Sequence, residues 1–287
     1  MRKAWALLVA SALAACVAPP AVDDARRPPP TPPPSTSDAP PAPSPPPPAA
    51  APPLPAATLR NAFVEPGLQA FAATAARQAQ AMPDTVWLDD RRARAQVALT
   101  FDDGPDDVGC PAVARVLAAR GVTATFFLLG EEVARRPAAA LALADAGHEL
   151  ALHGWSHRSM RAMAPTRAFA THVERARTAL RAAVGDRFVE TLFRPPYGDA
   201  TDDQLHLLAA RGVRVPLWSI DSLDWRPGAT AETIVATTVS LLHPGAIVLM
   251  HCGRGHGEAT AAALPALLDE LHARGLAPVT VGRLLAP

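Results

Sequence analysis

The 287-residue chain has only three cysteines and one tyrosine, and its 27 basic residues balance its 27 acidic ones. So few cysteines exclude a small domain stapled by several disulfides. The lack of net charge excludes the basic field that attracts nucleic acid, so we expect no nucleic-acid partner. No Gly-x-Ser-x-Gly motif is present, which argues against a serine hydrolase. Because 49% of the residues are apolar, a globular enzyme remains possible.

The sequence also lacks an apolar run long enough to span about 30 Å of hydrocarbon. The short run 4–15 follows Arg2 and Lys3 and is typical of an export signal. Its last residues, Leu13-Ala14-Ala15-Cys16, resemble the lipobox of bacterial lipoproteins, in which the cysteine is acylated and becomes the new N-terminus. We therefore predict an exported protein, lipid-anchored through Cys16 and facing the periplasm. The alternative is ordinary signal-peptidase cleavage, which would release a soluble secreted protein.

Proline is distributed unevenly: 18 of the 32 prolines lie between residues 19 and 55. Such a segment cannot form a helix or pack a core, and predicts a stiff, disordered linker. In polyproline II its 37 residues would reach up to about 110 Å. The predicted organisation is a signal peptide at 1–15, the lipidated cysteine and linker at 16–57, a helical extension at 58–94, and a folded domain at 95–287.

Hydrophobic periodicity divides the remainder into alternating strands and helices. Helical spacing predicts a helix over 66–82. Buried strands are predicted at 96–101, 124–129, 149–152, 213–218 and 246–250. Helices are predicted at 111–119, 167–184, 201–210, 232–242 and 260–273. This alternation predicts an α/β fold with a parallel sheet, either open or closed into a barrel.

Polar residues gather near the predicted strand ends, where α/β proteins bind ligands. Two imidazoles four residues apart and one carboxylate are a suitable metal-binding set that leaves positions open for water and substrate. The alternatives are a solvated Asp-Asp-Gly-Pro turn and ordinary buried histidines. The candidates are Asp102, Asp103, His153, His157, Arg194, Tyr197, Asp221, Asp224 and His251.

Five motifs in this order resemble the NodB-homology polysaccharide deacetylases, carbohydrate esterase family 4. They occupy residues 100–105, 153–157, 194–197, 221–225 and 249–251. The resemblance covers about residues 95–285 and implies a distorted (β/α) barrel. It makes 95–287 a polysaccharide deacetylase domain.

The resemblance also implies residue roles. Asp103, His153 and His157 would bind a divalent metal, with zinc favoured over cobalt, manganese or nickel. Asp102 would be the general base, oriented by Arg194, and His251 the general acid, held by Asp224. Tyr197, Trp225 and Leu249 would contact substrate, although core packing is an equally good interpretation of Trp225 and Leu249.

One departure from the family pattern is Gly154, which stands where the family usually has Ser or Thr between the two histidines. The supporting hydrogen bond of that hydroxyl is lost, and metal affinity can change by about 10- to 100-fold when such contacts are removed. Five other histidines match no motif and are predicted to be surface or capping residues: His148, His172, His206, His243 and His272.

The function implied is hydrolysis of N-acetyl groups on an envelope or extracellular polysaccharide, with the N-acetylglucosamine units of peptidoglycan preferred. Exopolysaccharide, chitin oligomers and O-acetylated xylan are alternative substrates. A catalytically silent carbohydrate-binding lipoprotein is the alternative from another class. The sequence does not distinguish the polymers or give the oligomeric state.

The two cysteines other than Cys16 form an even pair in an oxidising compartment. Cys110 follows the first predicted strand of the domain, and Cys252 directly follows His251. In a closed barrel the first and last strands are neighbours, so we predict a disulfide between Cys110 and Cys252. Two unpaired thiols, or a thiol near the metal, remain alternatives.

Overall fold

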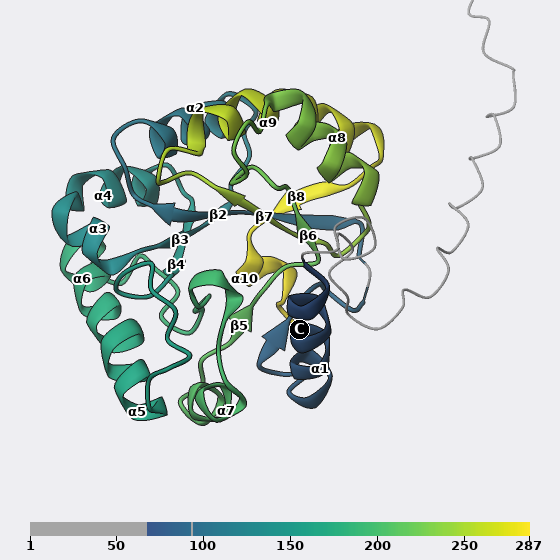
Figure 1. Cartoon of the computed structure of the whole chain (residues 1–287). Helices are drawn as coiled ribbons and strands as arrows, with labels where there is room; N and C mark the ends of the chain where they lie inside the picture. Colours follow the sequence, from purple (N-terminus) through teal and green to yellow (C-terminus); the bar gives the residue numbers. More distant parts are fainter. Residues whose placement is uncertain (1–67, 93) are drawn as a thin grey trace, which may run out of the picture. The chain divides into compact units, whose positions relative to one another are not determined.

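The computed structural model describes residues 68–92 and 94–287 (Figure 1). The predicted export signal, Cys16 and the proline-rich linker lie outside the described residues. In the described part, no helix has the length and apolar character needed to cross a membrane.

A parallel sheet forms the centre of the described chain, with β2 (Gln96–Gly104) in its middle. On one side β2 pairs with β3 (Thr125–Leu128), which pairs with β4 (Glu149–Leu152). On the other it pairs with β7 (Ile247–His251), which pairs with β6 (Ile220–Asp221). The short β8 (Ala277–Val279) pairs with the start of β2. Eight of the nine β2 residues are buried, as expected for a strand covered on both faces.

Short bridges extend from the β4 edge of this sheet round to the start of β7, which makes a distorted barrel. Parallel bridges join Leu152 to Phe193 and Leu192 to Arg214. Residues just beyond them form β5 (Val215–Pro216), which pairs in parallel with β1 (Val86–Trp87). An antiparallel bridge from Asp89 to Ala246 then reaches the residue before β7. Residues 86–89 therefore help to close the barrel, although they precede residue 95, where the domain was predicted to begin.

Helices surround the strands, and α2, α8 and α9 lie together on one side (Figure 1). Helix α1 packs its alanines into the core, and Phe71 stacks on Trp218 with ring centroids 5.0 Å apart. The helices are α1 (Gln69–Ala81), α2 (Gly109–Ala119), α3 (Gly130–Arg135), α4 (Pro137–Asp145), α5 (Pro165–Ala168), α6 (Arg175–Val184), α7 (Asp202–Ala210), α8 (Ala231–Leu241), α9 (Gly257–Ala273) and α10 (Val281–Leu284).

The predicted α/β fold is confirmed, and two predicted elements need correction. The strand predicted over 213–218 forms but is shorter than predicted, since only Val215 and Pro216 make up β5. The carbonyl groups of Pro216 and Leu217 instead accept hydrogen bonds from the Arg194 guanidinium, at 2.9 Å each, in place of a neighbouring strand. The predicted helix over 167–184 is interrupted by a π-helical segment, Phe169–Glu174, between α5 and α6.

Three of the five histidines predicted to be surface or capping residues are buried. His148, His172 and His243 are only 6%, 1% and 4% exposed, whereas His206 and His272 are exposed as expected. His243 pairs with Ser219, with 3.0 Å between its Nε2 and the hydroxyl oxygen. Sequence periodicity did not reveal this burial because each of the three contacts an element distant in sequence.

Candidate active site

The two consecutive aspartates at the end of β2 both point toward His153, although successive strand residues normally face opposite sides. Asp102 Oδ2 lies 3.7 Å and Asp103 Oδ1 lies 3.4 Å from His153 Nε2. Asp103 has φ of 72°, in the left-handed region, and the β2–β3 register shifts between Phe101 and Gly104. This local irregularity turns the second carboxylate to the same side as the first.

Asp103 and the two histidines after β4 form a candidate metal site. Their candidate ligand atoms all lie within 4.8 Å of one another, with Asp103 Oδ1 3.4 Å from His157 Nε2. His153 Nδ1 lies 2.8 Å from the Arg194 carbonyl oxygen, to which it donates, and this contact leaves Nε2 facing Asp103. The buried Asp103 Oδ1 has no hydrogen-bond partner among the described residues. An orphaned carboxylate oxygen facing two imidazoles fits a divalent cation.

The protonation states at this site suit metal binding. Although burial alone would raise the pKa of Asp103, the surrounding imidazoles of His153, His251 and His157 hold it well below its usual value. Burial lowers the pKa of His157 to about 4, against the opposing charge of Asp103. Near neutral pH these groups are an ionised carboxylate and a neutral imidazole, which are the forms that bind metals.

Arg194 holds Asp102 in place from the barrel interior. Its guanidinium is fully buried, and Nη1 donates to Asp102 Oδ1 and to Thr100 Oγ1, each at 2.8 Å. Nε and Nη2 donate to the carbonyl oxygens of Pro216 and Leu217, so every nitrogen of the guanidinium has an acceptor. A buried charge fixed this way orients the Asp102 carboxylate and compensates its charge.

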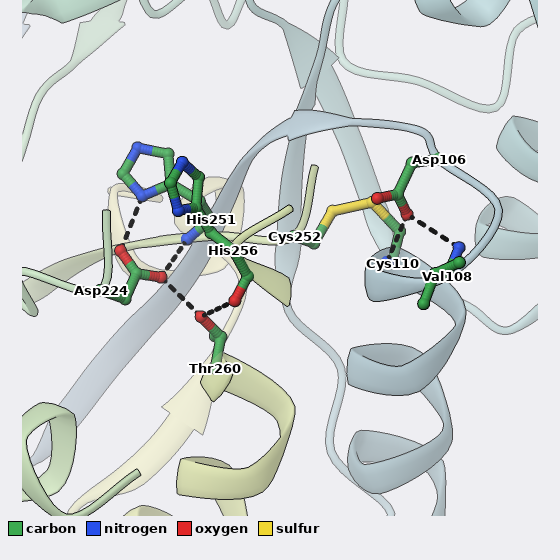
Figure 2. The surroundings of a disulfide bond; sticks show 8 residues. All are labelled: Asp106, Val108, Cys110, Asp224, His251, Cys252, His256 and Thr260. Carbon is green, nitrogen blue, oxygen red and sulfur yellow. Dashed lines mark hydrogen bonds and ion pairs between the residues drawn. A yellow bond between two sulfur atoms is a disulfide. The ribbon is translucent and has the colours of Figure 1, made fainter. Parts of the chain in front are cut away.

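The second part of the site is an imidazole–carboxylate pair at the end of β7 (Figure 2). His251 lies opposite Asp102 in the β2–β7 register. Its Nδ1 is 2.7 Å from Asp224 Oδ1, and its backbone N–H donates to Asp224 Oδ2 at 2.7 Å. Thr260 Oγ1 also donates to that carboxylate, at 2.6 Å. Although burial opposes it, the charge of Asp224 raises the pKa of His251 to about 10.

The predicted substrate-contacting residues differ in exposure. Tyr197 is 58% exposed, adopts φ of 62°, and places its ring 4.3 Å from the His157 ring. Trp225 is 37% exposed, and its Nε1 donates to Asp221 Oδ1 at 3.1 Å. Leu249 is 4% exposed within β7. Asp221, to which the sequence had assigned no role, therefore anchors Trp225.

The imidazole of His172 packs directly against Gly154. Gly154 has φ of 87°, and a Cβ added there would lie 2.8 Å from His172 Nδ1. The imidazole of His172 therefore fills space that a side chain between the two metal-site histidines would need. The sequence could not indicate this contact, since His172 belongs to the π-helical segment after α5.

Cys110 and Cys252 form a disulfide, with their Cα atoms 4.6 Å apart (Figure 2). The bond joins the first turn of α2 to the residue after His251. Added Cβ atoms at Gly104 would lie 2.6 Å from Cys110 Sγ and 2.9 Å from Cys252 Sγ. The absence of a side chain at Gly104 thus lets the bridge lie directly under the turn that follows the two aspartates.

A candidate metal-binding triad, an oriented carboxylate and an imidazole–carboxylate pair therefore lie together on one rim of a parallel barrel. This is the set of groups that a metal-assisted hydrolase requires.

Comparisons with known proteins specify the class further. The polysaccharide deacetylase family model matches residues 89–216. A peptidoglycan-N-acetylglucosamine deacetylase of Bacillus cereus is 32% identical over 189 residues, covering 66% of this chain and 67% of the relative. A chitooligosaccharide deacetylase of Sinorhizobium fredii is 37% identical over 190 residues, covering 62% and 86% respectively. The chain belongs to the polysaccharide deacetylase family.

A solved structure shows the same architecture. The crystal structure of the Bc1960 peptidoglycan N-acetylglucosamine deacetylase superposes with a TM-score of 0.63 and 31% sequence identity, covering 67% of this chain and 88% of the other. The sequence-based assignment to this family and to its α/β fold is thereby confirmed.

Proposed function

We propose that this polysaccharide deacetylase hydrolyses the N-acetyl groups of N-acetylglucosamine units in peptidoglycan. The observation that carries the proposal is the convergence of Asp103, His153 and His157 beside the oriented carboxylate of Asp102. Two of the similar proteins are peptidoglycan-N-acetylglucosamine deacetylases, which favours this polymer as the substrate. The chitooligosaccharide deacetylase relative makes chitin oligomers the second candidate.

The three ligand residues would hold a divalent cation, with zinc preferred because two imidazoles and a carboxylate suit it. When bound, the cation supplies Lewis-acid polarisation of the acetamide carbonyl and activates water. Cobalt, manganese and nickel are the alternative cations.

The remaining residues would move the protons. Asp102, held by Arg194, accepts a proton from the attacking water, whose oxygen forms the new bond to the acetyl carbon. His251 donates a proton to the nitrogen as the carbon–nitrogen bond breaks, giving acetate and a free amine. A pKa of about 10 keeps His251 protonated at neutral pH, so that the donor is ready when substrate binds.

Acetate release tests the substrate. The full-length protein would be incubated with peptidoglycan glycan strands, chitin oligomers, exopolysaccharide and acetylated xylan, each with zinc. We expect the highest kcat/KM on the peptidoglycan strands. A higher value on chitin oligomers would move the substrate to that class, and no acetate from any polymer would contradict deacetylation.

For the cellular location, we propose export and lipid anchoring at Cys16, on the sequence pattern described above. Replacing this residue, Cys16→Ser, should move the protein from the membrane fraction to the soluble or unprocessed fraction. Equal detergent partitioning of the variant and the parent protein would refute lipidation at this position.

A further inference from the structure

A polar cavity of about 490 Å³ adjoins the metal site on the side of His157. It lies between the loop after β4, the N-terminus of α3, the π-helical segment and the loop after β7. None of the roles assigned above uses it. The lining residues include Glu131, Trp155, His157, Arg158, His172 and Arg254.

Two arginines bring positive charge to this cavity. Arg254 stands between Gly253 and Gly255 with φ of 57°, and its Nε lies 3.7 Å from Asp103 Oδ2. Its side chain is nevertheless 54% exposed, so the guanidinium remains accessible to a ligand in the cavity that it lines. Arg158 directly follows His157 and is exposed, and it makes no ion pair with any residue that the structure describes.

A third guanidinium lies nearby. Arg175 is exposed and packs over the Trp155 ring, with 3.6 Å between its Cζ and the ring centroid. Trp155 itself lines the cavity. This stacking holds a further positive charge beside the same wall.

Negative charge at the cavity does not balance these groups. Glu131 is the carboxylate in the lining, and it already pairs with Arg135 at 3.5 Å. Asp103, the partner of Arg254, would share its charge with the cation of the proposed metal site. The field in the cavity is therefore positive and favours an anion.

We infer that this cavity is a subsite for a carboxylate carried by the sugar next to the N-acetylglucosamine unit that reacts. This inference rests on the proposed function and specifies its substrate class. In peptidoglycan the neighbouring sugar is N-acetylmuramic acid, whose lactyl group is a free carboxylate or carries a peptide with its own carboxylates. A chitin oligomer has no such group. Arg158 and Arg254 would thus be specificity-determining residues that favour acidic glycans over neutral ones.

The test compares four substrates on the full-length protein. Peptide-free peptidoglycan strands carry free lactyl carboxylates, and the same strands after carboxyl amidation are identical except for charge. Peptide-bearing strands place the carboxylates on the peptide, and chitopentaose is neutral throughout. For each substrate, kcat/KM for acetate release and the Kd from calorimetry are measured at low and high NaCl.

We expect the wild-type protein to prefer free over amidated strands by about threefold to tenfold at low salt, since partly exposed ion pairs contribute modestly. The preference should appear mainly in KM and Kd and should weaken in high NaCl. Whichever carboxylated strand is preferred, peptide-free or peptide-bearing, identifies the source of the carboxylate.

Variants identify the residues. Arg158→Gln and Arg254→Gln should each lower the ratio of kcat/KM on free strands to that on amidated strands by about threefold, and Arg158→Glu should lower it further. The control is Arg161→Gln, which removes a 58%-exposed arginine that pairs with Asp199 and does not line the cavity. It should keep the wild-type ratio.

Equal kcat/KM and Kd for free and amidated strands would overturn the inference, as would wild-type ratios in both the Arg158→Gln and the Arg254→Gln variant. A failure of the proposed function looks different. In that case no polymer yields acetate. A lower Kd for carboxylated than for amidated strands would still support the subsite, and an equal Kd for the two would reject it.

Discussion

Replacing Asp224 by asparagine tests the role of the pair that it forms with His251. The Asp224 carboxylate is 2% exposed and accepts three hydrogen bonds, two from His251 and one from Thr260. Burial alone would lower the pKa of His251 below the usual 6.5; the Asp224 carboxylate, with smaller contributions from Asp103 and Asp102, raises it to about 10. At pH 8 a histidine with a pKa of 10 is about 99% protonated, and one with a pKa of 6.5 is about 3% protonated.

If His251 is the proton donor, Asp224→Asn should lose its activity as the pH rises above about 6.5, while the wild-type protein keeps its activity to about pH 9. With the His251 pKa back at its ordinary 6.5, the variant's kcat should fall about 25-fold between pH 6 and pH 8, following the fraction of protonated His251. The assay is acetate release from peptidoglycan strands between pH 5.5 and pH 10.

The matched control for this experiment is Thr260→Val. This variant removes one hydrogen bond to the Asp224 carboxylate but keeps the charge of that carboxylate. The alkaline side of its pH–activity profile should therefore stay close to that of the wild-type protein. If the activity of Asp224→Asn fell at the same alkaline pH as that of the wild-type protein, Asp224 would not set the pKa of the proton donor. Recovery of the variant at pH 6 separates loss of the proton from loss of the fold.

Three other predictions concern the base, the disulfide and a close backbone contact. Asp102→Asn should lower kcat by at least about 100-fold and leave metal content unchanged, because it removes the proposed base but no proposed ligand. Loss of metal from this variant would contradict the assignment of Asp102 as base and Asp103 as ligand. Thiol titration of the unfolded, unreduced protein carrying Cys16→Ser should find no free thiol, whereas two free thiols would contradict the bond between Cys110 and Cys252. Gly253→Ala should weaken metal binding about tenfold or more, because its Cβ would lie 2.2 Å from the Asp103 carbonyl oxygen; unchanged affinity by calorimetry would contradict this.

Local sequence was sufficient for the elements whose burial follows a simple period. The strands at 96–101 and 149–152 appear as β2 and β4, and the helix predicted at 201–210 appears as α7. The latter begins at Thr201 with a capping box that involves Gln204. Strands and caps of this kind depend on residues close in sequence, so their patterns are visible without the fold.

Features that depend on distant contacts were not predictable. The strand predicted over 213–218 is short because Arg194, about twenty residues earlier, takes the carbonyl groups that a neighbouring strand would use. The left-handed φ of Asp103 and the burial of His172 against Gly154 likewise arise from tertiary packing. Motif order identified the candidate site residues, whereas their relative positions required the barrel.

The most direct test of the central claim is the metal content and activity of the full-length protein beside its His157→Ala variant. The account predicts about one divalent cation per wild-type chain, loss of acetate release on chelation and its recovery with zinc. His157→Ala should lose both the metal and the activity. Acetate release that survives complete removal of the metal, or a His157→Ala protein that keeps its metal and its rate, would contradict the account.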